Sequence, residues 1–276
     1  MIIKNIKNFD LDNTITCGQI FRYEKEEDNS FTVILSDRII NIKKDKNDLI
    51  VNSNNMNNLE EVVRNYFDLD RDYEKINNIL LENDIEIKEI IDKSKGLKMI
   101  REPHFEVIIS YILSSNNGVP QIKNALDNIS KKYGKKVYFN NKEYYLFPST
   151  EKLKDCTIEE LRRLKTGFRD KYIYEFVKKI NNNEFSLDII NELDSKEAMK
   201  YLMENKGIGE KVASCILLFG YQRFDVFPID TWVKKYMNDK YNLTTVKEIT
   251  NFTKEKYKDY SALAIQYMFN SKRNKN

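Results

Sequence analysis

A Gly-Ile-Gly turn between two helical segments constrains this chain more than any other feature of its sequence. Residues 199–205 have helical character, Gly207-Ile208-Gly209 follows, and the segment from Val212 to Leu218 is mostly apolar. Two glycines around one apolar residue allow a tight turn, and the first amide groups of the second helix are left unpaired. The pattern predicts a helix–hairpin–helix whose second helix can bind a phosphate at its N-terminus.

Two residues beside this hairpin are candidates for chemistry. Lys211 lies two positions after Gly209, and Asp230 follows 19 positions later, after a proline, at the start of another predicted helix. A helix N-terminus and removal from water both favour the neutral amine, which is the nucleophilic form of lysine. The alternatives are a solvated lysine and a helix-capping aspartate, and an aspartate can cap a helix and act in catalysis at once.

The residues of this region resemble the Gly-Pro-Asp type of helix–hairpin–helix signature found in base-excision DNA glycosylases. Other segments, in the same order, resemble landmarks of the 8-oxoguanine DNA glycosylase family. They are Cys17 to Tyr23 (its GQ-x-FRW segment), Ser114 to Asn117 (its Asn-rich loop), Thr166 to Tyr172 (its G-Y-R-x-x-Y turn) and Ala264 to Phe269 (its closing helix). The resemblance covers nearly the whole chain.

The resemblance implies an enzyme that excises 8-oxoguanine from duplex DNA and nicks the strand by β-elimination. Lys211 would form a Schiff base with the sugar, and Asp230 would stabilise the developing sugar cation. A monofunctional glycosylase for alkylated bases and a non-catalytic DNA-binding module are the alternatives. Lys211 argues against the first, and the combination of Lys211, Asp230 and Gly18 argues against the second.

The resemblance also implies a base pocket. Phe269 and Cys215 would cover opposite faces of the flipped purine, and the Gly18 carbonyl would accept the N7–H that 8-oxoguanine has and guanine lacks. Pro228 and Gln266 would complete the pocket. Without the resemblance, Cys215 reads as a small buried apolar residue.

A further set of residues is expected to contact DNA. Phe168 would be the wedge in the duplex, and Asn116 would fill the space that the flipped nucleotide leaves. Asn117 and Gln121 would also contact the DNA. Arg169 would bind the opposite base, and Gly207 and Gly209 a phosphate. The alternatives are a core aromatic for Phe168 and turn formation for the asparagines.

The sequence departs from the family pattern at three positions. Ile265 stands where the family often has a glutamine, with Gln266 one position later, and Trp232 stands where animal enzymes carry a histidine. Gln121 replaces an arginine of the animal enzymes, and losing that charged donor predicts a relaxed preference for cytosine opposite the lesion.

No cofactor is expected for catalysis. By resemblance, the main-chain carbonyls of Met203, Asn205 and Ile208 would hold a structural cation, monovalent or calcium-like, at the hairpin.

Composition restricts the remaining function classes. With 46 basic and 43 acidic residues, the net charge of +3 permits DNA binding without requiring it. Three dispersed cysteines, Cys17, Cys156 and Cys215, suit a reducing compartment and are too few for a four-cysteine iron–sulfur site. One histidine leaves little room for a His-rich zinc site. With no signal peptide or spanning segment, we expect a monomeric, cytoplasmic protein associated with the nucleoid, whose partner is duplex DNA and not a membrane.

The predicted fold class is α+β, with an N-terminal antiparallel sheet domain (residues 1–95) and a helical helix–hairpin–helix domain (residues 96–276) whose two lobes enclose the active cleft. Alternating segments 31–35, 38–42 and 49–51 predict strands, and 135–145 predicts a small hairpin around Asn140-Asn141. Helical spacing predicts helices at 58–67, 104–113, 122–133, 158–164, 171–180 and 196–205, and residues 68–73 are expected to open a further helix.

Overall fold

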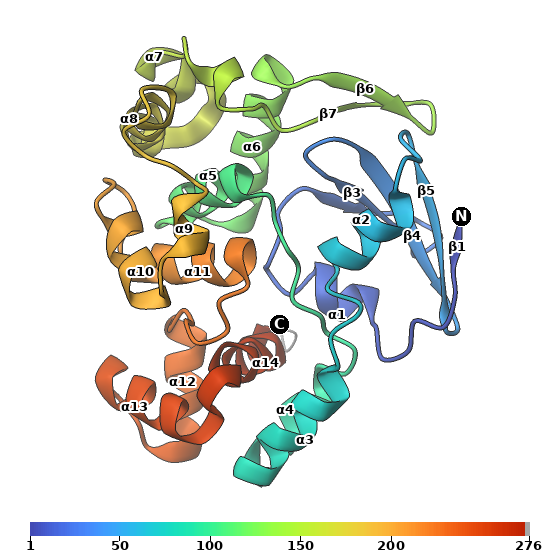
Figure 1. Ribbon diagram of the computed structural model, residues 1–276, viewed down its shortest axis with the longest axis vertical. Coiled ribbons are helices and arrows are strands. Elements are labelled where there is room, and N and C mark those ends of the chain that lie inside the picture. The colour runs from blue at the N-terminus through green and yellow to red at the C-terminus, as the bar shows by residue number, and fades with distance from the viewer. Residues whose placement is uncertain (274–276) are drawn as a thin grey trace.

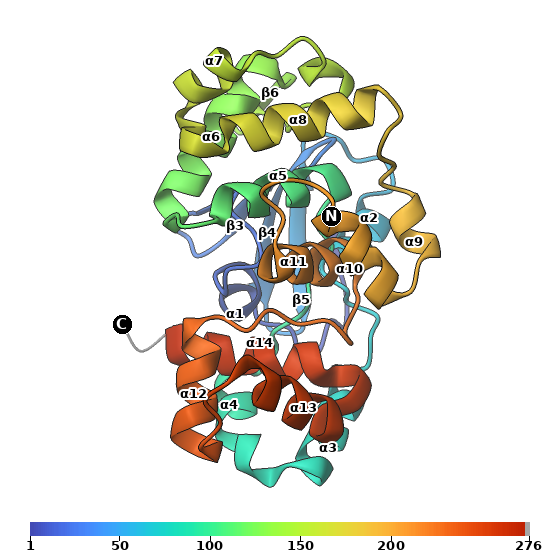
Figure 2. The same ribbon diagram turned by 90° about the vertical axis from the view of Figure 1, so that its left-hand side faces the viewer.

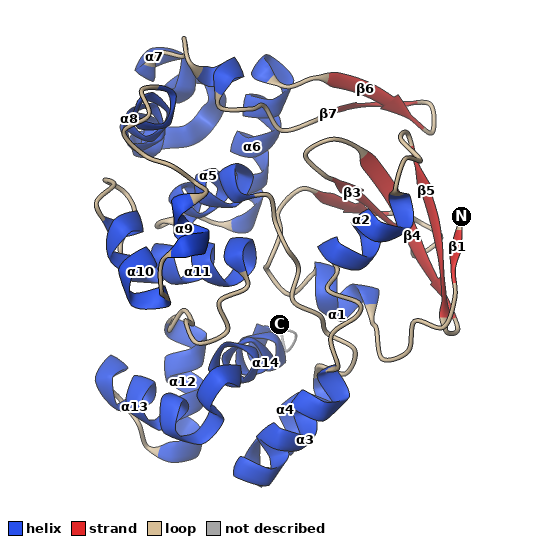
Figure 3. Cartoon of the chain, viewed as in Figure 1, coloured by secondary structure: helices blue, strands red, loops and turns tan. Residues whose placement is uncertain are grey.

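The computed structural model describes residues 1–273. Its N-terminal part is a five-stranded antiparallel sheet of order β1-β5-β4-β3-β2, drawn in red in Figure 3. The strands are β1 (Ile2–Ile3), β2 (Tyr23–Lys25), β3 (Phe31–Ile34), β4 (Ile39–Asp45) and β5 (Asp48–Ser53). The three predicted strands are confirmed. The sequence missed β1 and β2, because two or three residues are too short for an alternating pattern to register.

One face of this sheet forms a hydrophobic core. Phe31 pairs with Ile42, which pairs with Val51, and all three side chains are buried. Helices α1 (Leu11–Ile15) and α2 (Leu59–Tyr66) add Leu11, Ile15, Leu59 and Val63 to the same cluster. Asp10 caps α1 by accepting the N–H of Asn13 at 2.7 Å. The sheet thus places the segment after α1, which contains Gly18, beside the helical part.

The rest of the molecule is mostly helical, as predicted (Figure 1). Its helices are α3 (Tyr73–Asn83), α4 (Lys88–Lys93), α5 (His104–Ser114), α6 (Val119–Tyr133), α7 (Ile158–Leu161), α8 (Asp170–Asn181), α9 (Ile189–Glu192), α10 (Ser195–Met203), α11 (Glu210–Tyr221), α12 (Thr231–Tyr241), α13 (Val246–Tyr257) and α14 (Ser261–Arg273). The predicted hairpin is present as β6 (Lys136–Phe139) and β7 (Lys142–Tyr145), joined by Asn140 and Asn141 at positive φ.

The helix predictions need correction at one boundary and at several short or polar helices. The helix expected over 158–164 ends at Leu161, because a π-helical turn over Arg162–Thr166 follows, with Lys165 at φ 70°. Helices α1, α4, α9 and α13 were not predicted, although Thr245 and Glu248 form a capping box at the start of α13. That box is a sequence signal for a helix N-terminus and could have revealed α13.

The apolar clusters of the structure do not divide at residue 95. Apolar residues of α3 and α4, such as Leu80 and Ile90, belong to the large cluster of the helical part, whereas Ile100 belongs to the sheet cluster. Helix α4 packs against α14, and α3 packs against α13, although these helices lie far apart in the sequence. The predicted boundary between residues 1–95 and 96–276 therefore does not coincide with the boundary between the two apolar clusters.

Helix α11 lies at the centre of the helical part and packs against α5 and α10 (Figure 2). Every residue of α11 from Val212 to Gly220 is buried. At Gly220 a Cβ atom would lie 2.8 Å from Cγ1 of Val107, so glycine permits the close approach of α11 to α5. The fixed core positions the exposed first turn of α11, where Lys211 lies.

Candidate active site

The hairpin has the predicted geometry. Helix α10 ends at Met203, Gly207 turns the chain at φ 87°, and α11 begins at Glu210. A Cβ at Gly207 would lie 2.6 Å from the Tyr172 ring, whereas a Cβ at Gly209 would meet no atom within 4 Å. Gly209 is the exposed N-cap of α11 and supplies no side-chain cap, so the first amides of this helix face outward.

Lys211 and Asp230 lie in or directly before the first turns of two successive helices and line the same cavity, of about 450 Å³, hereafter the base cavity. Lys211 is exposed on α11. Asp230 is the N-cap of α12, and its carboxylate accepts the N–H of Val233 at 2.9 Å. The capping interpretation of Asp230 is thus confirmed, and the cap holds the carboxylate in place beside the cavity.

The base cavity collects residues from four distant parts of the chain. All five residues predicted to bind the base line it: Gly18, Cys215, Pro228, Gln266 and Phe269. Asn117, Trp232 and Ile265 line it as well. The sequence reasoning missed Phe21, Tyr111, Ser114, Val119, Ile122, Phe219 and Val233. Of these, Phe21 and Ser114 lie inside segments already singled out, and Val119 is an exposed residue at the start of α6. The others are buried on helices and gave no separate signal.

The carbonyl edge at Gly18 is held from two sides. The Tyr111 hydroxyl lies 3.3 Å from the carbonyl oxygens of both Gly18 and Gln19, which share its proton, and the Gln266 side chain donates to the Cys17 carbonyl at 3.2 Å. Gly18 itself has φ 87°, a conformation that glycine adopts without strain. Gln266 and Ile265 both line the cavity, so the glutamine and the isoleucine that stands at the family's usual glutamine position both belong to the site.

Cys215 is 6% exposed, and burial raises the pKa of its thiol to about 12. The nearby Lys211 charge opposes this shift and Asp230 reinforces it. The thiol therefore stays protonated and presents a neutral wall to the cavity. All three cysteines are buried and free of disulfides, as the sequence predicted.

Comparison with known proteins identifies the family. A family model described as the N-terminal domain of 8-oxoguanine DNA glycosylase matches residues 1–108. The crystal structure of the Clostridium acetobutylicum 8-oxoguanine glycosylase/lyase, bound to duplex DNA with cytosine opposite 8-oxoguanine, matches with a TM-score of 0.94. Its sequence is 36% identical, over 100% of this chain and 95% of that chain. This chain belongs to the 8-oxoguanine DNA glycosylase/lyase family.

More distant proteins agree with this assignment to the glycosylase/lyase family. The probable N-glycosylase/DNA lyase of Methanothermobacter thermautotrophicus is 28% identical over 78% of this chain and 75% of its own length. The N-glycosylase/DNA lyase of Saccharomyces cerevisiae is 26% identical over 92% of this chain and 73% of its own length.

A surface expected to meet DNA in a glycosylase/lyase lies around Phe168. This side chain is 57% exposed, so the alternative of a core aromatic is wrong. The Arg169 guanidinium carbon lies 4.2 Å from the centre of the Phe168 ring, and Tyr172 contacts the ring edge-on. An exposed aromatic fixed by neighbours from its own turn is suited to inserting into a duplex.

Arg169 is arranged differently from the expected base-reading residue. It is 5% exposed, and its guanidinium donates to the main-chain carbonyls of Ser115, Asn116 and Thr166. Burial lowers its pKa. Without DNA, Arg169 thus holds the Asn-rich loop, and its contact with an opposite base stays a prediction.

The remaining predicted DNA contacts are at the surface near the base cavity. Asn116 is exposed at φ 52°, so the turn interpretation of this asparagine is confirmed without excluding contact with DNA. Asn117 donates to the Leu113 carbonyl at 3.0 Å, and Gln121 is exposed in the first turns of α6. Trp232, 37% exposed, stands at the rim of the base cavity.

The hairpin carbonyls keep capacity for a cation. The Asn205 carbonyl accepts the N–H of Ile208 at 3.1 Å, which leaves it a second lone pair. The Lys179 ammonium lies 3.4 Å from the Glu204 carbonyl and 3.1 Å from Oδ1 of Asn205, so a positive charge already rests against this end of α10. Within residues 1–273, no group of three or more His, Cys, Asp or Glu side chains could hold a metal, so a cation here would rely on main-chain oxygens.

Proposed function

We propose that this protein excises 8-oxoguanine from duplex DNA through a Schiff base on Lys211 and then nicks the strand. Its family supplies the reaction class, DNA glycosylase with lyase activity, and DNA as the partner. One arrangement carries the assignment of residues: Lys211, Asp230 and the Gly18 carbonyl line a single cavity. Its volume of about 450 Å³ lies in the range of small-ligand sites.

The reaction requires the damaged nucleotide to leave the duplex. Phe168 enters the base stack, and Asn116 fills the space that the nucleotide vacates. Asn117 and Gln121 contact the DNA around the lesion, and Arg169 binds the opposite base. The outward-facing amides after Gly209 bind a phosphate. The flipped purine then lies between Cys215 and Phe269, with Pro228 and Gln266 at its edges.

Excision begins when the Lys211 amine attacks C1′ of the sugar. The C1′–N9 bond breaks, and the base leaves with the bonding electron pair and takes up a proton. Opening of the sugar ring at C1′–O4′ gives the Schiff base. Positive charge develops on the sugar in the transition state, and the Asp230 carboxylate, fixed by its bond to Val233 N–H, stabilises it.

Selection of the lesion depends on the Gly18 carbonyl. This oxygen accepts the N7–H of 8-oxoguanine, whereas guanine presents a lone pair at the same position. The Tyr111 hydroxyl uses one lone pair of the carbonyl and leaves the other for the base. Guanine is thus rejected because its N7 lone pair would face the Gly18 carbonyl oxygen, a second acceptor, in a cavity without water.

The alternatives fit the site less well. A module that only grips phosphates does not need a cavity that joins Gly18 to Lys211, and a monofunctional glycosylase does not need a lysine at this wall. A structural cation on the carbonyls of Met203, Asn205 and Ile208 is part of the proposal, and it would help the hairpin to bind a phosphate without taking part in the reaction. We further propose that the protein works as a monomer in the cytoplasm, at the nucleoid.

Membrane association is outside the proposal. Among residues 1–273, the structure contains no helix whose length and apolarity would allow it to cross a bilayer.

Borohydride trapping on a duplex with one 8-oxoguanine tests the proposal. Wild-type protein should give a covalent adduct, and Lys211→Gln should give none. Lys206→Gln is the matched control, because it removes a lysine of the hairpin that lies outside the base cavity. Base release without trapping would refute the Schiff base. The absence of both base release and trapping would refute 8-oxoguanine as the substrate.

A further inference from the structure

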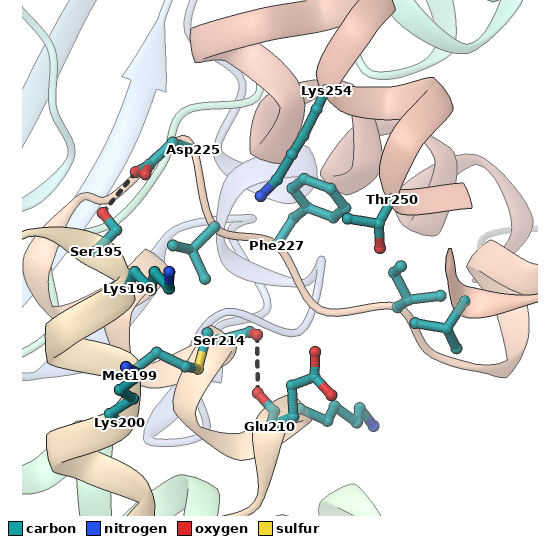
Figure 4. Close-up of a pocket in the computed structure, with 14 residues that line it drawn as sticks. Ser195, Lys196, Met199, Lys200, Glu210, Ser214, Asp225, Phe227, Thr250 and Lys254 are labelled. Carbon is teal, nitrogen blue, oxygen red and sulfur yellow. Dashed lines mark hydrogen bonds between the residues drawn. The ribbon is translucent and has the colours of Figure 1, made fainter. Parts of the chain in front are cut away.

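A second cavity, here called the lysine cavity, shares Lys211 with the base cavity. It has a volume of about 520 Å³ and lies between α10, the first turns of α11, the segment 225–229 and α13. Figure 4 shows Lys196 and Lys200 on α10, with Lys254 extending from α13 toward the segment that carries Phe227. None of the residues predicted for base or DNA binding lines it, and of the two predicted catalytic residues only Lys211 does.

The lining of the lysine cavity carries excess positive charge. Four lysines, Lys196, Lys200, Lys211 and Lys254, stand against two carboxylates, Glu210 and Asp225. The Asp225 carboxylate already accepts a hydrogen bond from the Ser195 hydroxyl at 2.9 Å. In the described part of the chain, none of the four lysines forms an ion pair within 4 Å. Because Lys211 is bonded to the sugar in the proposed reaction, Lys196, Lys200 and Lys254 are the lysines left to bind a ligand. Unpaired ammonium groups on several walls favour an anion.

We propose that the lysine cavity binds the terminal 5′-phosphate that strand nicking creates. This proposal rests on the lyase function proposed above. In β-elimination, water removes a proton from C2′ of the sugar held on Lys211, and a C2′=C3′ double bond forms. The C3′–O bond breaks, and its electron pair leaves with the oxygen. The departing strand therefore begins with a 5′-phosphate.

The shared lysine explains why the phosphate reaches this cavity. C1′ is bonded to Lys211, and the bond that breaks belongs to the same sugar, so the phosphate is released beside a residue that lines both cavities. A terminal phosphate carries a charge of about −1.5 to −2, whereas a phosphate within a strand carries −1. A cluster of ammonium groups therefore binds the product end more tightly than the intact strand.

Glu210 limits this affinity. Glu210 lines the same cavity as the lysines. The Ser214 hydroxyl donates to the main-chain oxygen of Glu210 at 2.8 Å and not to its carboxylate (Figure 4). A negative charge in the cavity repels the phosphate. Replacing Glu210 by glutamine should thus tighten product binding, while replacing the lysines should weaken it.

The experiment compares equilibrium binding to two nicked duplexes that differ only in a 5′-phosphate or a 5′-hydroxyl at the nick. Wild-type protein should prefer the phosphate by about tenfold, the size of one charge-assisted hydrogen bond. Lys200→Gln/Lys254→Gln should bring the ratio close to one, and Glu210→Gln should raise it. Lys75→Gln, which removes an exposed charge on α3, should leave it unchanged.

Equal binding of the two duplexes by the wild type, or a preference that survives the double lysine substitution, would overturn the proposal. Base release and borohydride trapping, measured on the same preparations, separate this result from the proposed function. Normal release and trapping with no 5′-phosphate preference would remove only the lysine-cavity assignment. A 5′-phosphate preference without release or trapping would refute the lyase function and keep the cavity as a phosphate site.

Discussion

The side-chain amide of Gln266, on the last helix, donates a 3.2 Å hydrogen bond to the main-chain carbonyl of Cys17, which directly precedes Gly18. Gln266 is 4% exposed, and Cys17 is fully buried. The bond joins two parts of the chain that are 249 residues apart. It therefore sets the position of the Gly18 edge of the base cavity relative to α14.

Replacing Gln266 by leucine should impair lesion recognition. The substitution removes the hydrogen bond from Gln266 to the Cys17 carbonyl, at a cost of about 1–3 kcal/mol, and frees the Gly18 edge to move. We expect single-turnover excision of 8-oxoguanine to slow by about tenfold, because misplacement of reacting groups is costly. Gln222→Leu is the control. Gln222 also donates to a main-chain carbonyl, that of Ile100, at 3.0 Å, and neither residue lines the base cavity. Equal rate losses in both variants would contradict a role at the cavity.

Substitutions at Asp230 should separate capping from catalysis. Asparagine caps a helix about as well as aspartate, so Asp230→Asn should keep the thermal stability, whereas Asp230→Ala should lose about 1 kcal/mol. Both should lower the excision rate by roughly 100-fold, because both remove the charge that stabilises the sugar cation. Thermal unfolding and single-turnover rates measure the two effects. Full activity in Asp230→Asn would show that only the cap matters.

Phe168→Ala should affect DNA opening and leave the fold intact. The side chain is 57% exposed, so its loss should change the free energy of unfolding by less than about 0.5 kcal/mol. Excision from a fully paired duplex should slow more than excision from a duplex mismatched at the lesion, because the mismatch lowers the cost of flipping. Tyr138→Ala removes another exposed aromatic, 68% accessible on the β6–β7 hairpin, and should change neither rate.

The carboxyl of Glu102 should make stability depend on pH. Burial, reinforced by the nearby Glu106 charge, raises the pKa of Glu102 from 4.5 to about 8, and the Tyr66 hydroxyl donates to it. As the pH rises from about 4.5 to 8, the unfolded chain loses this proton while the folded chain keeps it. Folding stability therefore falls over this range.

Glu102→Gln tests this dependence, because it keeps an acceptor for Tyr66 and cannot ionise. The variant should gain stability relative to the wild type, on the order of 4 kcal/mol at pH 8, with little difference near pH 4. Chemical denaturation across this range measures both proteins. A constant difference at all pH values would show that Glu102 does not titrate with folding.

Gln121 should govern the choice of the opposite base. Because this exposed side chain on α6 is neutral, the wild type should cleave 8-oxoguanine with weak preference for cytosine opposite the lesion. Gln121→Arg should sharpen that preference by about tenfold, the value of one charged donor to a base. Cleavage of four duplexes that differ only in the opposite base tests it, and sharp cytosine selection by the wild type would refute the expectation.

Short-range patterns were enough to predict the hairpin, the apolar helix after it and the cap at Asp230. These features depend on backbone conformation and on contacts between residues a few positions apart, which the order of residues encodes directly. The strand positions within 31–51 and the β6–β7 hairpin follow for the same reason. The resemblance then supplied the five base-cavity residues, and the structure places all of them on one cavity.

Tertiary packing decided the rest. Helices α3 and α4 join the helical core, and Arg169 turns toward the carbonyls of Ser115 and Asn116. The lysine cavity forms where α10, α11 and α13 meet, and Tyr111 reaches the Gly18 carbonyl from α5. Each of these contacts joins residues far apart in the chain. Their geometry depends on which helix faces pack together, and that is fixed by the burial of the whole apolar surface and not by any local sequence pattern.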